Sequence, residues 1–535
     1  MLRRRTVLSL AFFAISSVTL VGVPRTTAQP PKAGEKSTVR DPFYIEAPAW
    51  PADLRPKAFE WKNGTTALDA AKNPKSVKDL ELLAKIVIYK VTDRKYFTPS
   101  IEQKFGFGKN ETNVIANPEP GDTMDGVMTE INRYVLVPRA SEQFPYLQIE
   151  YIQEFGKATD AAIRDVLKKA GNDPKAAIVR VNAGRALASV CRSGAAAHVP
   201  LLVELIKSET TPPELQFWAL KAAENLIGAM DIVKAKEGRT ELHALKDQEL
   251  ALIVNAIDGA IARYSKYAMP PAPATPPAPQ TPPPATTPPS PPAGGNPPPK
   301  PPMGGAVAPA PPTGNQPVGG RMEAAITPRP YDPDVAFYLR KQAVRAIAKC
   351  RKVHLSDANN TLARPGVILA RFAVGDPSVV PVAQPHEYAE AAMGLASMVP
   401  DNKVNIDVLL DATAAAVSGF GAWKVTGFDQ AEAKVVLWKK TATAIAGALA
   451  TFKTMPDKSP AANSYRQKIA SLADICLREV IEPIRNEQEG VAATSARPDE
   501  VNRWRNEPAN ARQSELLLRD DPQSKVSLPR SAGKR

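Results

Sequence analysis

The feature that most restricts the fold of this 535-residue chain is a proline-rich tract at residues 270–317. The tract contains 22 of the chain's 54 prolines, and Lys300 is its only charged residue. Proline lacks a backbone N–H donor and breaks helices and sheets, so a segment of this composition cannot build a hydrophobic core. The sequence predicts a disordered, partly polyproline II segment here, serving either as a solvated spacer or as bait for an aromatic groove.

An alanine-rich pattern recurs on both sides of the tract. The stretches AGRALASV, ALKAAENL, IDGAIARY and AVRAIAKC each place small and apolar residues at the spacing of one helical face. Their anchor alanines, Ala186, Ala222, Ala260 and Ala346, are separated by 36, 38 and 86 residues. Removing the 48 residues of the tract shortens the last step to 38 and restores the period. The tract is therefore predicted to be an insertion in one loop of a continuous helical stack.

Helix pairs that repeat with a period near 40 residues resemble HEAT and armadillo repeats. The resemblance covers residues 159–351 and extends more loosely to the helices that contain AAMGLASM, TATAIAGA and KIASLADIC. It implies an all-α fold of stacked helical hairpins, an α-solenoid, interrupted by the disordered proline-rich loop. It also implies that proteins or peptides bind along an extended surface.

The segments before these repeats contain weaker helical signals. An apolar face at residues 77–91 predicts a helix, and shorter helices are expected near 123–136 and 142–155. Residues 159–170 form a further apolar stripe that Gly171 can end in the left-handed conformation, and Asp173-Pro174 can begin the next helix.

Composition divides the chain into six segments. They are a signal peptide at 1–28, an extended aromatic and proline-rich strap at 29–76, an N-terminal helical-repeat part at 77–269, the insertion at 270–317, a C-terminal helical-repeat part of the same solenoid at 318–490, and a disordered tail at 491–535. Frequent prolines at residues 42–56 predict that the strap is not helical. Its aromatic rings either cover the open end of the helical core or form an arm that binds a partner.

The N-terminus has the pattern of a secretory signal. Three arginines at residues 3–5 precede an uncharged run at 6–23 and small residues at 26–28. We expect export to the periplasm or the extracellular side of a bacterial envelope, with the segment either cleaved or retained as an anchor. No other segment is predicted to span a membrane. Without the four arginines of the signal the formal charge falls from +13 to +9, which favours weak attraction to anionic envelope polymers and argues against nucleic acid.

The search for chemical motifs finds neither a catalytic nor a cofactor or metal site. Three cysteines, Cys191, Cys350 and Cys476, exclude a disulfide scaffold, and Cys191 and Cys350 are predicted to lie too far apart for a bridge. His386 begins a sequence similar to the zinc-protease motif H-E-x-x-H, but Glu390 replaces the second histidine. We therefore predict a protein that is not an enzyme and has no cofactor.

The leading functional prediction is an exported scaffold or binding protein of the cell envelope. Its partner would be a protein, a peptide or an anionic envelope polymer. Arg185, Lys221 and Arg345 occupy one equivalent repeat position on the expected concave helices, and Asp258 interrupts the row. These basic residues are predicted either to contact an acidic partner or to be a solvated helix flank. The alternatives are an envelope hydrolase or polysaccharide-processing enzyme with converging carboxylates, and a structural wall-associated spacer.

Overall fold

Packed helices account for almost all of the described secondary structure. The computed structural model describes residues 41–63, 65–66, 68, 70, 72–97, 123–135, 145–229, 245–269, 331–357, 360–422, 431–486 and 496–528. Within these ranges the only sheet is a two-stranded hairpin. The predicted all-α fold class is confirmed. The proposed signal segment and the proline-rich tract lie outside the described residues.

The N-terminal strap contains a helix that the sequence analysis did not predict. α1 (Leu54–Asn63) includes Pro56 in its first turn, where backbone N–H groups have no intrahelical partner and proline is tolerated. The prediction that prolines exclude a helix from the strap is wrong for α1. Trp61 is buried, and the ring of Phe59 stacks on that of Tyr134 with centroids 5.2 Å apart. The aromatic rings of the strap therefore pack on the first helices.

The helices that follow bury the faces expected from their apolar spacing. α2 (Pro74–Ile88) buries Leu80, Leu83 and Val87, and it packs against α5 (Pro145–Ala170). α4 (Met124–Val135) lies close to the predicted short helix at 123–136. The two helices predicted at 142–155 and 159–170 are instead one continuous helix, α5, and Gly156 between them lets the helix approach Ala195 closely.

The turn after α5 forms as its residues predict. Gly171 has a backbone φ of 51°, the left-handed conformation that glycine adopts without steric cost. The carboxylate of Asp173 then accepts a hydrogen bond from the backbone N–H of Lys175 at 2.8 Å. A 3-10 turn at Pro174–Ala176 leads into α6 (Ala177–Val190).

Small residues allow the helices of neighbouring pairs to approach closely. α7 (Val199–Lys207) and α8 (Pro213–Gly228) follow α6, and the anchor alanines Ala186 and Ala222 are fully buried. A Cβ atom at Gly184 of α6 would lie only 2.6 Å from Cβ of Trp218 in α8. A larger residue at that position would force the two helices apart.

The helices around the proline-rich tract are the two halves of one hairpin. α9 (Asp247–Ala268) precedes the tract and α10 (Pro333–Ile347) follows it, and the two pack extensively on each other. Near the end of α9, the ring of Tyr264 lies 5.9 Å from that of Tyr331, just before α10. At the opposite end, Lys352 Nζ lies 2.8 Å from Asp247 Oδ1. The tract therefore leaves and re-enters the fold at the same end of an antiparallel pair.

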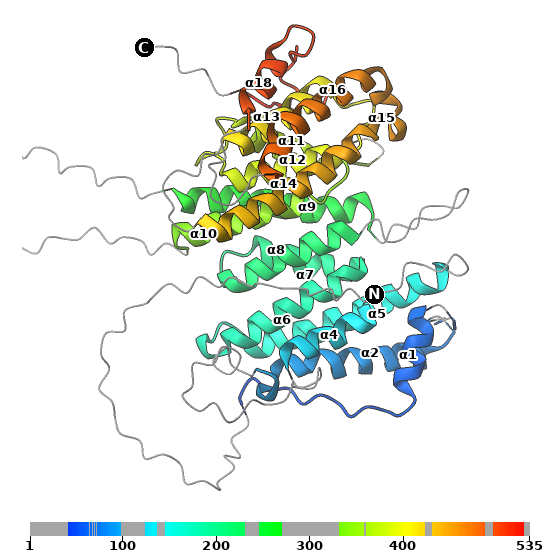
Figure 1. Cartoon of the computed structure of the whole chain (residues 1–535). Coiled ribbons are helices and arrows are strands. Elements are labelled where there is room, and N and C mark those ends of the chain that lie inside the picture. The colour runs from blue at the N-terminus through cyan, green and yellow to red at the C-terminus, as the bar shows by residue number, and fades with distance from the viewer. Residues whose placement is uncertain are drawn as a thin grey trace, which may run out of the picture. The chain divides into compact units, whose positions relative to one another are not determined.

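This arrangement corrects one step of the repeat analysis. α10 packs beside α8, which packs beside α6, so these three helices share one layer. α9 packs beside α7 in the second layer, and its contact with α8 is slight. The stretch IDGAIARY is therefore not equivalent to the other three, because both layers bury small and apolar residues and the pattern alone does not distinguish them. Figure 1 shows the pairs α7–α8 and α9–α10 following one another in chain order.

The second half of the chain continues the α6–α8–α10 layer. Its elements are β1 (Leu355–Ser356), β2 (Thr361–Ala363), α11 (Pro365–Val374), α12 (Pro385–Ser397), α13 (Ile406–Ala422), α14 (Ala431–Lys453), α15 (Met455–Lys458), α16 (Arg466–Cys476) and α17 (Glu482–Arg485). The strands are antiparallel, with Leu355 opposite Ala363, and the hairpin contacts α9. α12 packs beside α10 and α14 beside α12, while α11 and α13 contact each other and α12.

The C-terminal residues form an ordered segment that the sequence analysis missed. We call residues 496–528 the C-terminal strap; it includes α18 (Pro498–Asn506) and packs on α13 and α16. Val501 and Trp504 are buried, and Leu518 pairs with Val404 in an isolated antiparallel bridge. The prediction of a disordered tail is wrong for these residues, because a few buried side chains and many ion pairs hold a segment of polar composition.

One core joins the chain on both sides of the tract. The buried apolar residues from Phe43 to Val526 belong to a single cluster, and Phe43–Arg535 is one compact unit. Among the described residues, no helix has the length and apolar character needed to cross a membrane.

Candidate functional site

The three predicted basic residues lie on adjacent helices of one layer, but each forms an ion pair within the molecule. Arg185 Nη2 on α6 lies 2.6 Å from Asp125 Oδ1 on α4. Lys221 Nζ on α8 lies 2.7 Å from Glu224 Oε2 on the same helix. Arg345 Nε on α10 lies 3.2 Å from Glu224 Oε1. The row is therefore a series of charge pairs, of which those of Arg185 and Arg345 connect neighbouring helices.

The spacing of this row differs from the prediction in two ways. Arg345 lies beside Glu224, one helical turn beyond Lys221, so its position is not strictly equivalent to that of Lys221. Asp258 belongs to α9 in the other layer, so it does not interrupt the row.

Two buried carboxylates share the guanidinium of Arg345. Arg345 Nε lies 3.2 Å from Glu224 Oε1 and 3.8 Å from Glu390 Oε1 on α12. Burial raises the pKa of Glu390, and the opposing effect of Arg345 is smaller. Burial acts in the same direction on Glu224, but its hydrogen bonds from Lys221 and Gln342 and the charge of Arg345 lower its pKa overall. Environments that separate the pKa values of two carboxylates are also a feature of acid–base catalytic pairs.

The contacts of Glu224 favour a structural role for this pair. Its Oε2 accepts hydrogen bonds from Lys221 Nζ at 2.7 Å and from Gln342 Nε2 at 2.8 Å, while Oε1 accepts one from Arg345. Both oxygens of Glu224 thus already have protein donors. The pair connects α8, α10 and α12. Because both oxygens of Glu224 already accept hydrogen bonds from protein groups, neither is available to a substrate.

A fully buried ion pair lies deeper between α10 and α12. Arg340 and Glu387 are both 0% exposed, and two parallel hydrogen bonds of 2.8 Å join the guanidinium to the carboxylate. Arg340 Nη1 also lies 3.4 Å from Ser265 Oγ on α9. A bidentate pair in a dry interior is strong and geometrically specific. Arg340 therefore ties together three helices, one of which precedes the tract.

His386 lies next to this buried pair at the start of α12. Burial, together with the positive charges of Lys341 and Arg340, lowers the pKa of His386 to about 3. Its Nε2 is buried and has no hydrogen-bond partner. His386 is therefore neutral at physiological pH.

Aromatic side chains gather where α8 and α10 pack together. We define the aromatic strip as Phe217, Trp218, Phe337 and Tyr338. The rings of Phe217 and Tyr338 stack across the two helices with centroids 5.3 Å apart, and Phe217 meets Trp218 edge to face at 5.2 Å. Tyr338 is 55% exposed, whereas the other three are partly buried. Aromatic surface of this kind is typical of binding sites.

The sequence analysis did not identify the strip, although a signal was present. In α8 the buried face is formed by Ala219, Ala222 and Leu226, and Phe217 lies instead four residues before Lys221. Residues four apart share a helix face, so an aromatic ring at that position predicts an outward-facing side chain. The alanine spacing identifies only the packed face of α8 and does not include Phe217.

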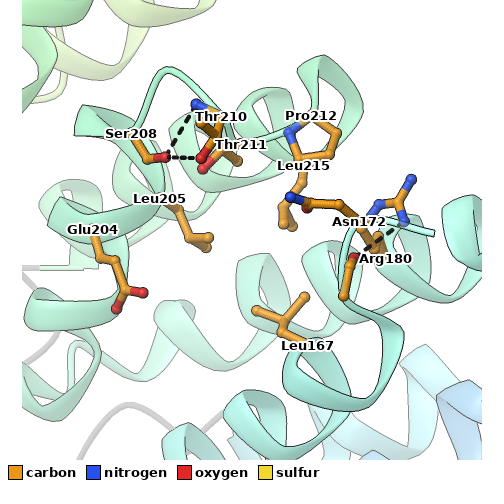
Figure 2. Close-up of a pocket in the computed structure, with 11 residues that line it drawn as sticks. Leu167, Asn172, Arg180, Glu204, Leu205, Ser208, Thr210, Thr211, Pro212 and Leu215 are labelled. Carbon is orange, nitrogen blue, oxygen red and sulfur yellow. Dashed lines mark hydrogen bonds between the residues drawn. The ribbon is translucent and has the colours of Figure 1, made fainter. Parts of the chain in front are cut away.

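The structure also has a shallow cavity where the loops after α5 and α7 meet. Its volume is about 220 Å³, and Figure 2 shows the side chains that line it. The lining residues are Leu167, Gly171, Asn172, Arg180, Glu204, Leu205, Ser208, Thr210, Thr211, Pro212 and Leu215. The hydroxyls of Ser208 and Thr210 are 3.0 Å apart and bond to each other. Neither hydroxyl has a neighbouring base among the lining residues that would activate it as a nucleophile.

Arg180 is the only cation that lines this cavity, and its donors are already used. Its Nη1 donates to the carbonyls of Gly171 at 3.2 Å and Asp173 at 2.7 Å. Its Nη2 lies 3.1 Å from Glu214 Oε1. Arg180 therefore holds the turns after α5 and before α8, and its charge is already paired within the protein.

Thiols and imidazoles do not assemble a reactive centre in the described part of the chain. The three cysteines are buried and free, and burial raises the pKa of Cys350 to about 11 and that of Cys191 well above its usual range. Thiols with raised pKa values are poor nucleophiles. His198 is 0% exposed, with Nδ1 3.5 Å from Asp160 Oδ1. Across the described residues, no group of three or more His, Cys, Asp or Glu side chains could hold a metal ion.

Comparison of the chain with protein-family models, curated proteins and solved structures found no match.

Proposed function

We propose that this chain is an exported, HEAT-like scaffold of the bacterial cell envelope that binds an extended protein or peptide segment along α6, α8, α10 and α12. The stacked pairs α5–α6, α7–α8 and α9–α10 support a helical-repeat architecture. Export rests on the arginines, the uncharged run and the small residues of the N-terminal segment.

The observation that carries the binding proposal is the aromatic strip. Aromatic rings supply much of the binding energy at protein interfaces, and a stacked pair across two helices is already ordered before a partner arrives. Tyr338 keeps 55% of its surface exposed while its ring stacks on that of Phe217. The charge pairs at Lys221 and Arg345 lie one to two turns further along the same helices. An extended segment that crosses the helices at the aromatic strip would therefore make apolar contacts there. Its polar groups could contact the charge pairs at Lys221 and Arg345.

Retention of envelope proteins by matched variants tests this proposal. The full chain and its Tyr338→Ala variant would be immobilised and exposed to envelope extract, and the retained proteins identified by mass spectrometry. Leu252→Ala is the control, because Leu252 is 52% exposed but lies on α9 in the other layer. We expect Tyr338→Ala to lose at least one partner that both the parent chain and the control retain. Identical retention by all three proteins would contradict the proposal.

A polysaccharide hydrolase is the second candidate, because Glu224 and Glu390 both lie within 3.8 Å of Arg345 Nε. Retaining and inverting glycosidases use a pair of nearby carboxylates. If Glu390 supplied the proton, Glu390→Gln would abolish release of sugars from isolated cell walls. Equal release by the parent and the variant would exclude this role.

A wall-associated spacer is the third candidate. The proline-rich tract and the net positive charge of the chain could both contact anionic envelope material. Deletion of residues 270–317 would then reduce co-sedimentation with envelope fragments, whereas unchanged sedimentation would remove this candidate.

A further inference from the structure

The aromatic strip lies at the end of the α9–α10 hairpin from which the proline-rich tract emerges. Tyr331 lies just before α10 and contacts Tyr264 and Tyr267 of α9, with ring centroids 5.9 and 5.4 Å apart. Asp332 caps α10 by accepting a hydrogen bond from the backbone N–H of Asp334 at 2.9 Å. Tyr338 follows six residues later, a rise of about 9 Å along the helix. Residue 331, where the described chain resumes after the tract, is therefore close to the strip.

The length and the two ends of the tract allow it to reach the strip. The chain leaves the described structure after residue 269 and returns at residue 331. A segment of this length spans several tens of Å even when it is not extended, since the r.m.s. end-to-end distance of a flexible chain is about 5–6 Å times the square root of its length. The described residues on either side of this segment lie at one end of the same hairpin, where Tyr267 and Tyr331 meet.

The composition of the tract also matches the chemistry of the strip. Proline-rich segments dock on grooves lined by aromatic rings, because their polyproline II conformation has little entropy left to lose. From residue 270 to residue 317 the tract has no acidic residue and only Lys300 as a charge. A neutral segment gains little from the charge pairs at Lys221 and Arg345, so its contact with the protein would be apolar. An acidic peptide would instead bind with a strong dependence on salt.

We infer that the proline-rich segment 270–317 of this chain docks in cis on the aromatic strip of α8 and α10. This inference rests on the proposed function, since it names the first occupant of the same surface. A tethered ligand acts at an effective concentration in the millimolar range, so even weak docking competes with a partner in solution. A partner that binds the strip must then displace the tract. Competition from the tract therefore weakens the apparent affinity of that partner.

A labelled peptide measures this competition directly. A fluorescent peptide with the sequence of residues 274–302 would be titrated into the full chain and into a variant that lacks residues 270–317, with fluorescence anisotropy as the readout. We expect the peptide to bind the deletion variant and to bind the intact chain at least tenfold more weakly, because the tract already occupies the strip. No binding to the deletion variant, or equal binding to both proteins, would overturn the inference.

Variants in the deletion background locate the site. Tyr338→Ala should abolish peptide binding, whereas Leu252→Ala, a comparably exposed position on α9, should leave it unchanged. A peptide with serine in place of proline should not bind. The affinity should stay within about twofold between low and high salt, since the contact is apolar. Peptide binding that survives Tyr338→Ala would contradict the assigned site.

Oxidative footprinting of the intact protein gives an independent measurement without an added ligand. Hydroxyl-radical labelling of Tyr338, quantified by mass spectrometry, should rise at least threefold when the tract is deleted, and labelling of Leu252 should not change. Equal labelling of Tyr338 in both proteins would overturn docking in cis. If this inference failed while envelope partners were still lost in Tyr338→Ala, the proposed binding function would stand and only its occupant would change.

Discussion

The helices around the proline-rich tract and the C-terminal strap are attached to the fold by different forces. At the α9–α10–α12 junction the contacts are mainly apolar, with one dry ion pair between Arg340 and Glu387. The strap also buries a few apolar side chains, including Val501 and Leu517, but it adds arginine contacts to α11 and α13. Arg505 Nε lies 2.8 Å from Asp411 Oδ1, Arg364 pairs with Asp521, and other polar contacts join backbone groups.

This difference predicts distinct responses to mutation, pH and salt. A buried ion pair is costly to break because the remaining charge stays desolvated, and Arg340–Glu387 is the more completely buried of the pairs compared. The strap pair Arg364–Asp521 keeps part of its surface exposed, so water and counterions can replace it more easily. The helices of the junction should therefore separate only when the whole protein unfolds. The strap should detach first and separately.

The largest effect is expected from breaking the buried pair at the junction. Arg340→Ala leaves the Glu387 carboxylate in a site that is 0% exposed, and this should lower the free energy of unfolding by about 3–5 kcal/mol. Chemical denaturation of the variant measures the loss. The double variant Arg340→Met/Glu387→Leu removes both charges and should recover most of the stability. A loss below 1 kcal/mol in the single variant would contradict this description of the junction.

A smaller effect is expected from the central carboxylate of the strap. Asp411 is buried and faces both Arg505 and Arg512, so Asp411→Asn should cost about 2–3 kcal/mol locally. The visible result should be faster proteolytic removal of residues 496–528, while the helical circular dichroism of the remainder is retained. Glu500→Gln is the matched control, because Glu500 is more exposed and pairs only with Arg503. Simultaneous loss of the strap and the whole fold would show that the two regions are not separable.

The pH dependence should also distinguish the two regions. The pKa of His386 at the junction is about 3, below its ordinary value near 6.5, so the unfolded chain binds a proton that the folded chain does not. Stability is therefore fully present above pH 6.5 and falls as the pH drops toward 3, by on the order of 1–2 kcal/mol between pH 7 and pH 5. His386→Gln should flatten the stability profile in this window. An unchanged slope would exclude His386 as its source.

The strap should respond to acid only at lower pH. Burial tends to raise the pKa of Asp521, but its hydrogen bond from Arg364 outweighs that effect and the pKa is lowered. The contribution of this carboxylate to stability is thus present above the ordinary aspartate pKa near 4 and is lost as the pH falls below it.

The smallest effect is expected at the exposed pair that joins α4 to α6. Arg185→Ala removes an ion pair in which Asp125 is 76% exposed, so the free energy of unfolding should change by less than about 1 kcal/mol. The change should also shrink at high salt, because exposed charges are screened. A thermal denaturation series at low and high salt measures both effects. A large, salt-independent loss would mean that the predicted basic row is part of the core.

The sequence predicted that helices on both sides of the tract pack together, although it assigned α9 to the wrong layer, and it predicted the C-terminal strap poorly, for a physical reason. Small residues such as Ala222 and Ala346 recur at helical spacing because packed helices leave no room for larger side chains, and this periodicity is visible without coordinates. The strap has no such period. Its attachment depends on Arg505 and Arg512 meeting Asp411 nearly a hundred residues earlier in the chain, and a list of charged residues does not show which of them meet.

The candidate site was predictable only in part. The layer that carries Arg185, Lys221 and Arg345 follows from the repeats, but their acidic neighbours come from adjacent helices whose register the sequence does not determine. The assignment of α9 to the wrong layer had the same origin, since both layers bury small residues. The stacking of Phe217 on Tyr338 joins residues on opposite sides of the tract and needed the structure.

Cleavage within the tract tests most directly whether the helices on its two sides share one core. A protease site would be inserted between residues 285 and 295, the purified protein cleaved under native conditions, and the products examined by size-exclusion chromatography with light scattering. The two fragments should elute together with the mass of the uncleaved chain and unfold in a single transition. Elution as two separate folded species, each with its own unfolding transition, would contradict the account.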